Sequence, residues 1–64
     1  MKVNGETIVL NKPVTLSEFL TENKYAEARV AVEINGKIIP KQDYNALILT
    51  NNDTLEIVSF VGGG

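Results

Sequence analysis

The sequence predicts a small α+β domain in which one helix packs against one face of a mixed sheet. Two Asn-Gly pairs, at residues 4–5 and 35–36, lie between short apolar runs. Both residue types tolerate positive φ, so each pair indicates a tight hairpin turn. Between the pairs, Leu16, Phe19 and Leu20 recur at the i, i+3, i+4 spacing of one helix face. A hairpin, a helix and further strands in this order are typical of an α+β fold.

The first part of the chain predicts a hairpin followed by the helix. The runs MKVN and TIVL flank the first Asn-Gly pair and form the two strands of the expected hairpin. Thr15 and Glu18 then have the spacing of a capping box, while Val14 and Phe19 have that of a hydrophobic staple. We therefore expect a helix that begins at Thr15 and runs for two or three turns. Its narrow apolar stripe needs a sheet to pack on.

The second part of the chain changes to the period of strands. Val30, Val32 and Ile34 share one face of a strand, and KIIP returns beside it after the second Asn-Gly pair until Pro40 ends the pairing. The stretch KQDYNALILT is interpreted as a turn or short 3₁₀ piece that leads to another apolar run, at residues 47–49. The order of elements is therefore ββαβ(β)β.

The last predicted strand, in LEIVSFV, has two different faces. Leu55 and Ile57 lie on one face and suit a central buried strand, while Glu56, Val58 and Phe60 lie on the other. The crossover rule makes the strand after the helix run parallel to one hairpin strand. The best fit is the ubiquitin-like β-grasp, which is a mixed sheet with one main helix on one face. We expect this domain to span residues 1–61.

Composition narrows the classes of function. The 64 residues contain no cysteine and no histidine, which removes disulfides, thiol nucleophiles, the usual general base and the commonest metal ligand. The net charge of −2, with no basic cluster, argues against nucleic-acid binding. No apolar run is long enough for a membrane span or a secretory signal. The sequence therefore predicts a soluble cytoplasmic domain without a metal site.

The C-terminal residues 62–64 are all glycine and form the most unusual segment. Glycine loses more conformational freedom on ordering than any other residue, so three in a row contribute little to a fold. The segment is either a frayed end or a displayed functional tail. We expect it to be flexible in the isolated protein and to become ordered only with a partner.

The chain resembles the thiamine-biosynthesis sulfur carrier proteins, which are small β-grasp proteins that end in Gly-Gly. The resemblance rests on the Asn-Gly hairpin at 4–5, VAVEINGKIIP at 30–40, Tyr44, and DTLEIVSFVGGG at 53–64. The final segment is the most specific part. Ser59 departs from the pattern, because members often carry histidine there.

The resemblance implies that the carboxylate of Gly64 is the reactive group. A partner adenylating (E1-like) enzyme would use ATP to form a Gly64 acyl-adenylate, and a cysteine-derived sulfur donor would convert it to a thiocarboxylate. Thiazole synthase would then receive the sulfur. The chain would be a carrier and co-substrate with no catalytic residue and no bound cofactor of its own. Gly62 and Gly63 would thread a narrow partner channel, since neither has a Cβ to clash with its walls.

The outward apolar residues near the tail are candidates for partner docking. Val58, Phe60 and Val61 would contact the partner, although Phe60 could instead fold over the sheet edge and pack there. Asp53 and Glu56 could meet a basic surface, but a solvated face is the simpler interpretation.

Three other functions are compatible with the sequence. A ubiquitin-like modifier would transfer the activated glycine to a lysine, and a sulfur carrier could instead serve molybdopterin or another product. A non-catalytic interaction module would need no special C-terminus.

Overall fold

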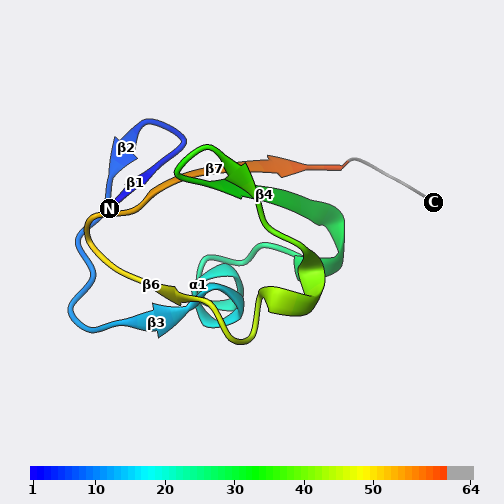
Figure 1. The fold of residues 1–64 in the computed structure, drawn as a ribbon, viewed down its shortest axis with the longest axis horizontal. Coiled ribbons are helices and arrows are strands. Elements are labelled where there is room, and N and C mark those ends of the chain that lie inside the picture. Colours follow the sequence, from blue (N-terminus) through cyan, green and yellow to red (C-terminus); the bar gives the residue numbers. More distant parts are fainter. Residues whose placement is uncertain (61–64) are drawn as a thin grey trace.

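A computed structural model describes residues 1–60, which form two sheets and one main helix (Figure 1). The expected tail and Val61 lie outside the described residues. No helix within residues 1–60 is both long enough and apolar enough to cross a membrane. In chain order the elements are β1 (Lys2–Val3), β2 (Glu6–Thr7), β3 (Val14–Thr15), α1 (Leu16–Glu22), the 3₁₀ helix η1 (Glu27–Arg29), β4 (Val30–Ile34), β5 (Lys37–Ile38), the 3₁₀ helix η2 (Lys41–Asp43), β6 (Ile48–Leu49) and β7 (Thr54–Ser59).

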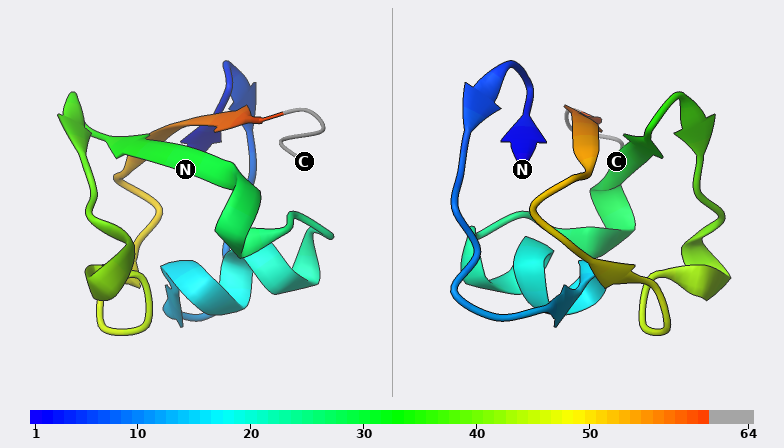
Figure 2. Two further views of the ribbon diagram at one scale, coloured as in Figure 1. Left: turned by 90° about the vertical axis from the view of Figure 1, so that its right-hand side faces the viewer. Right: turned by 60° about the vertical axis from the view of Figure 1, so that its left-hand side comes forward.

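Strand β7 is the middle strand of the main sheet. The strand order is β2-β1-β7-β4-β5, with β7 parallel to β1 and antiparallel to β4. Helix α1 lies against one face of this sheet, and the views in Figure 2 show no helix on the other face. This arrangement confirms the predicted ubiquitin-like β-grasp and the central position of the last strand.

The connection through α1 leads from β2 to β4, and these two strands run in the same direction, as expected. Strand β2 is antiparallel to β1, β1 is parallel to β7, and β7 is antiparallel to β4, so β2 and β4 run the same way. They are not neighbours, because β1 and β7 lie between them. The parallel hydrogen-bonded pair is β1 with β7, and it joins the two ends of the described chain.

Both predicted Asn-Gly turns close hairpins. The paired residues of β1 and β2, and those of β4 and β5, leave only the Asn-Gly pair between the strands. The two asparagines have φ of 51° and 52°, and the two glycines have φ of 87° and 86°. Positive φ at both central residues is the requirement of a type I′ turn, whose twist matches that of the strands.

Helix α1 begins where the capping box predicts. The Glu18 N–H donates to Thr15 Oγ1 at 3.0 Å, and the Thr15 N–H donates to Glu18 Oε1 at 2.9 Å. Thr15 is therefore the N-cap and Leu16 the first helical residue. The helix ends after about two turns at Glu22, within the predicted length.

A second, two-stranded sheet was not predicted. Strand β3 pairs with β6 in antiparallel fashion, so the residues just before the helix and the apolar run at 47–49 meet. The strand expected from TIVL is also shorter, because β2 ends at Thr7. Ile8 still exchanges two backbone hydrogen bonds with Met1. Farther along, the Leu10 N–H donates to Asn51 Oδ1 at 2.8 Å. These contacts tie the connection before the helix to the loop before β7.

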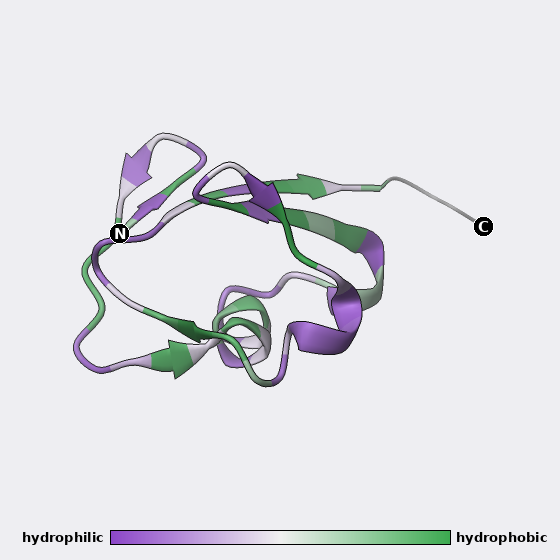
Figure 3. Cartoon of the chain, viewed as in Figure 1, coloured by the Kyte–Doolittle hydropathy of each residue, from purple (hydrophilic) through white to green (hydrophobic). Residues whose placement is uncertain are grey.

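The core lies between the main sheet and α1 and is built from buried apolar residues of both. Stretches of β4, β7 and α1 are coloured as hydrophobic in Figure 3. Tyr44, which follows η2, is only 1% exposed. Its carbonyl accepts a hydrogen bond from the Ser17 N–H at 3.0 Å, which links η2 to the start of α1. The buried apolar residues are Met1, Val3, Val14, Leu16, Phe19, Leu20, Val30, Val32, Ile34, Tyr44, Leu49, Leu55 and Ile57.

Candidate functional site

The end of β7 presents apolar side chains on the face of the sheet that α1 does not cover. Leu55 and Ile57 are buried, whereas Val58 is 59% exposed and Phe60 is 53% exposed. The Phe60 N–H donates to the Arg29 carbonyl at 2.7 Å. The backbone of Phe60 is thus fixed beside the start of β4 while much of its ring remains in solvent. Of the two positions considered for Phe60, the structure shows the exposed one.

Four of the residues predicted to form the site lie outside the described residues. They are Val61, expected to contact a partner, and Gly62, Gly63 and Gly64, expected to form the tail. Because Val58 and Phe60 immediately precede them, the described part of the candidate site is the C-terminal end of the central strand.

A shallow depression of about 140 Å³ continues this surface across β4 and β5. It adds a residue that sequence reasoning missed, Ile38, whose side chain is 76% exposed. Ile38 lies opposite Glu33, so the sheet register brings it to the same face as Val58. The alternation of β4 indicated which residues face outward, but the partner of each depends on the register between strands. The depression is lined by Ala31, Val32, Glu33, Ile38, Glu56 and Val58.

The two acidic residues considered for docking have different surroundings. Asp53 accepts hydrogen bonds from the Asn35 Nδ2 at 3.0 Å and from the Thr50 N–H at 2.8 Å. Its carboxylate therefore organises the turn before β7. Glu56 instead projects from the open face of the sheet, directly opposite Glu33.

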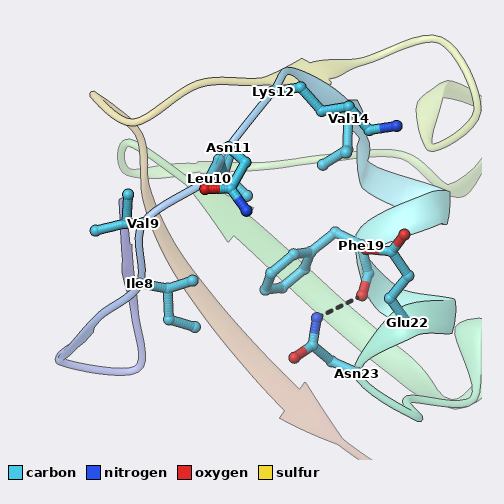
Figure 4. Close-up of a pocket in the computed structure, with 9 residues that line it drawn as sticks. All are labelled: Ile8, Val9, Leu10, Asn11, Lys12, Val14, Phe19, Glu22 and Asn23. Carbon is cyan, nitrogen blue, oxygen red and sulfur yellow. Dashed lines mark hydrogen bonds between the residues drawn. The ribbon is translucent and has the colours of Figure 1, made fainter.

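A separate groove of about 330 Å³ lies on the helix side of the molecule, between α1 and the connection from β2 to β3 (Figure 4). The Phe19 ring projects into it from the helix, and Asn23 Nδ2 donates to the Phe19 carbonyl at 2.8 Å. None of the residues that line this groove comes from β7. The groove is therefore distinct from the surface around Val58 and Phe60.

Within residues 1–60, no group of three or more histidine, cysteine, aspartate or glutamate side chains is placed to hold a metal ion. Burial raises the pKa of Tyr44, partly offset by its hydrogen bond with the Val32 backbone. This shift belongs to a core residue, since Tyr44 lies among the buried apolar side chains.

These features define a small ubiquitin-like β-grasp protein whose central strand leads directly to a C-terminal run of glycines. The model of the ThiS family matches residues 1–64, a range that includes all three glycines. The chain therefore belongs to the ThiS family.

Individual relatives agree with this assignment. The sulfur carrier protein ThiS of Bacillus subtilis is 35% identical over 65 residues, covering 100% of this chain and 98% of that protein. The thiazole synthase of Paramagnetospirillum magneticum is 39% identical over 62 residues, which cover 97% of this chain but only 19% of that protein. The crystal structure of the thiamine biosynthesis protein ThiS from Geobacter metallireducens has a TM-score of 0.81 at 30% identity, covering 98% of this chain and 96% of that one.

Proposed function

We propose that this protein is a sulfur carrier of thiamine biosynthesis and that the carboxylate of Gly64 carries the sulfur. The observation that supports this proposal most strongly is the family match over residues 1–64, because it extends through the terminal glycines. The Bacillus subtilis relative, similar along nearly its whole length, is a sulfur carrier protein. The fold agrees, since the central strand β7 precedes the glycines and exposes Val58 and Phe60 near its C-terminal end.

The proposed chemistry begins with activation of an inert carboxylate. A partner adenylating enzyme transfers AMP from ATP to the carboxylate of Gly64 and releases pyrophosphate, which makes AMP the leaving group. A cysteine-derived persulfide attacks the acyl-adenylate and displaces AMP. Reduction of the resulting acyl disulfide by a thiol leaves a Gly64 thiocarboxylate. The protein itself acts as a co-substrate in the cytoplasm, and ATP is bound by the partner.

Thiazole synthase is the proposed acceptor of the sulfur. In the Paramagnetospirillum magneticum protein of that name, a segment similar to this chain forms part of the same polypeptide. A single polypeptide keeps the carrier segment at a high effective concentration near the rest of the protein. We propose that the present chain makes the corresponding encounter, using Val58, Phe60 and Val61 to dock while Gly62 and Gly63 enter the partner.

The terminus is tested by deleting Gly64, and separately by adding one alanine after it. We expect both changes to abolish ATP–pyrophosphate exchange by the adenylating enzyme, because the carboxylate no longer reaches the reactive position. The melting temperature should stay nearly unchanged, since residues beyond the last strand contribute little to stability. Full exchange activity in the shortened chain would contradict the proposal.

The product separates the proposed function from its alternatives. After incubation with ATP, the adenylating enzyme and a sulfur donor, intact-mass spectrometry should show one oxygen of the carrier replaced by sulfur. A ubiquitin-like modifier would instead appear as a lysine conjugate of a second protein. Adding purified thiazole synthase should consume the thiocarboxylate, whereas consumption only by a molybdopterin-forming enzyme would favour the alternative acceptor.

A further inference from the structure

The open face of the main sheet carries two carboxylates directly opposite each other. Glu33 on β4 and Glu56 on β7 are a register pair of antiparallel strands. Side chains in such a pair have Cβ atoms about 4.5–5.5 Å apart, and like charges there are destabilising. The side-chain hydrogen bonds formed within residues 1–60 engage Glu18 and Asp53 but neither of these glutamates. Lys2 on the neighbouring strand β1 lies opposite Thr54, which precedes Glu56 by two residues on the same face of β7.

Apolar side chains border the two carboxylates. Ile38 lies across from Glu33 on β5, and Val58 is the next outward residue after Glu56 on β7. Together with Ala31 they line the depression of about 140 Å³. The surface therefore combines two facing carboxylates with hydrophobic walls.

The chemistry of the depression fits an arginine side chain of another protein. A guanidinium is planar and presents several N–H donors in a fixed fork, so it can donate to two carboxylates at once. Its aliphatic stem packs on apolar surface such as that of Ile38 and Val58. A divalent cation fits less well, because within residues 1–60 no group of three or more histidine, cysteine, aspartate or glutamate side chains is placed to hold a metal ion.

We infer that the depression around Glu33 and Glu56 binds an arginine on the protein that adenylates Gly64. This inference rests on the proposed function, because it assumes a partner that acts on the C-terminus. The depression shares Val58 with the surface at the end of β7, so one partner can cover both. Opposite charges across an interface steer encounter and fix its register. An arginine that donates to both carboxylates offsets their mutual repulsion in the complex.

The test uses the full chain and the purified adenylating enzyme of the same organism in ATP–pyrophosphate exchange. We expect Glu33→Gln and Glu56→Gln each to raise the KM for the carrier about 10-fold at low salt while kcat stays the same. Raising the ionic strength should shrink the difference from the wild type. Glu22→Gln is the matched control, because it removes the same charge from the helix side of the molecule.

Stability provides the second readout. Relief of the repulsion should leave the melting temperature of both variants equal to or above that of the wild type, whereas glutamates with a merely structural role would lower it on substitution. Unchanged KM values for both variants, equal to that of Glu22→Gln, would overturn the inference and leave the proposed function intact. A wild-type chain that supports no Gly64-dependent exchange would instead overturn the proposed function.

Discussion

At the scale of single residues, asparagine side chains replace missing strand neighbours. Asn4 ends the parallel pairing of β1 with β7, yet its Nδ2 donates to the Ile57 carbonyl at 3.2 Å and its Oδ1 accepts from the Ile57 N–H at 2.8 Å. Asn51 makes the same two bonds to Leu10. One amide side chain thus satisfies both backbone groups of a residue on a side where no strand pairs with it.

Replacing Asn4 tests this role. Asn4→Gly keeps the positive φ without strain and removes both side-chain bonds, so we expect a loss of about 1–2 kcal/mol in the free energy of unfolding. Asn4→Ala should cost about 1 kcal/mol more, because alanine is strained in the left-handed region. Urea denaturation measures both, and the exposed Asn52→Gly serves as control. Equal stability of the two Asn4 variants would contradict the backbone argument.

Phe60 is the second residue whose position permits a sharp test. Because its ring is about half exposed, Phe60→Glu should leave the circular dichroism spectrum unchanged and weaken binding to the adenylating enzyme by about 1–3 kcal/mol. Val9→Glu is the control, since Val9 is an exposed apolar residue on the helix side. Equal binding by both variants would remove Phe60 from the docking surface, and loss of folding would place its ring in the core.

At the scale of elements, α1 is short and depends on its N-terminal cap. A helix of seven residues is not stable on its own, so its free energy comes from packing and from the reciprocal bonds of Thr15 and Glu18. Thr15 also belongs to β3, which ties the start of the helix to β6. The cap therefore supports the small sheet as well as the helix.

The cap is tested by Thr15→Ala. We expect a loss of about 1 kcal/mol in the free energy of unfolding, the usual cost of removing a threonine N-cap. Thr21→Ala makes the same chemical change in the last turn of α1, where the exposed side chain is not part of the cap, and should be nearly neutral. Chemical denaturation of the two variants measures the difference, and similar losses in both would mean that the capping box contributes little.

Local sequence patterns predicted the turns and the helix better than they predicted which strands pair with each other. The Asn-Gly turns and the Thr15–Glu18 box are set by neighbouring residues, so the sequence shows them directly. The pairing of β3 with β6 joins residues 14–15 to 48–49, and two-residue strands have no periodicity to detect. The sequence did not predict that Glu33 lies opposite Glu56. The alternation along each strand indicates which face each residue is on, but it does not give the register between the two strands.

At the scale of the whole molecule, one buried tyrosine joins the layers. Tyr44 lies in the core between the sheet and α1, and burial raises the pKa of its hydroxyl above the usual 10.0. The hydrogen bond with the Val32 backbone lowers that pKa, and the nearby Glu27 carboxylate raises it further. The folded state therefore favours the neutral phenol more than the unfolded state does.

This preference makes global stability depend on pH in the alkaline range. The contribution of Tyr44 is fully present below its unfolded pKa of about 10 and is lost as pH rises through the higher folded pKa. We expect the stability advantage of the wild type over Tyr44→Phe to shrink as pH rises above 10. Thermal unfolding of both proteins across this range measures the effect. A constant difference would show that Tyr44 does not titrate differently in the two states.

The central position of β7 also affects how the protein is made. A ribosome delivers residues 54–59 after β1, α1 and β4, so the main sheet lacks its middle strand for most of synthesis. Neither β1 nor β4 has its principal neighbour until then, and the pairing of residues 2–3 with 54–55 must close a loop of nearly the whole described chain. A chain released early would lack both the strand that completes the fold and the glycines that follow it. The main sheet can therefore be completed only shortly before the glycines at 62–64 are added.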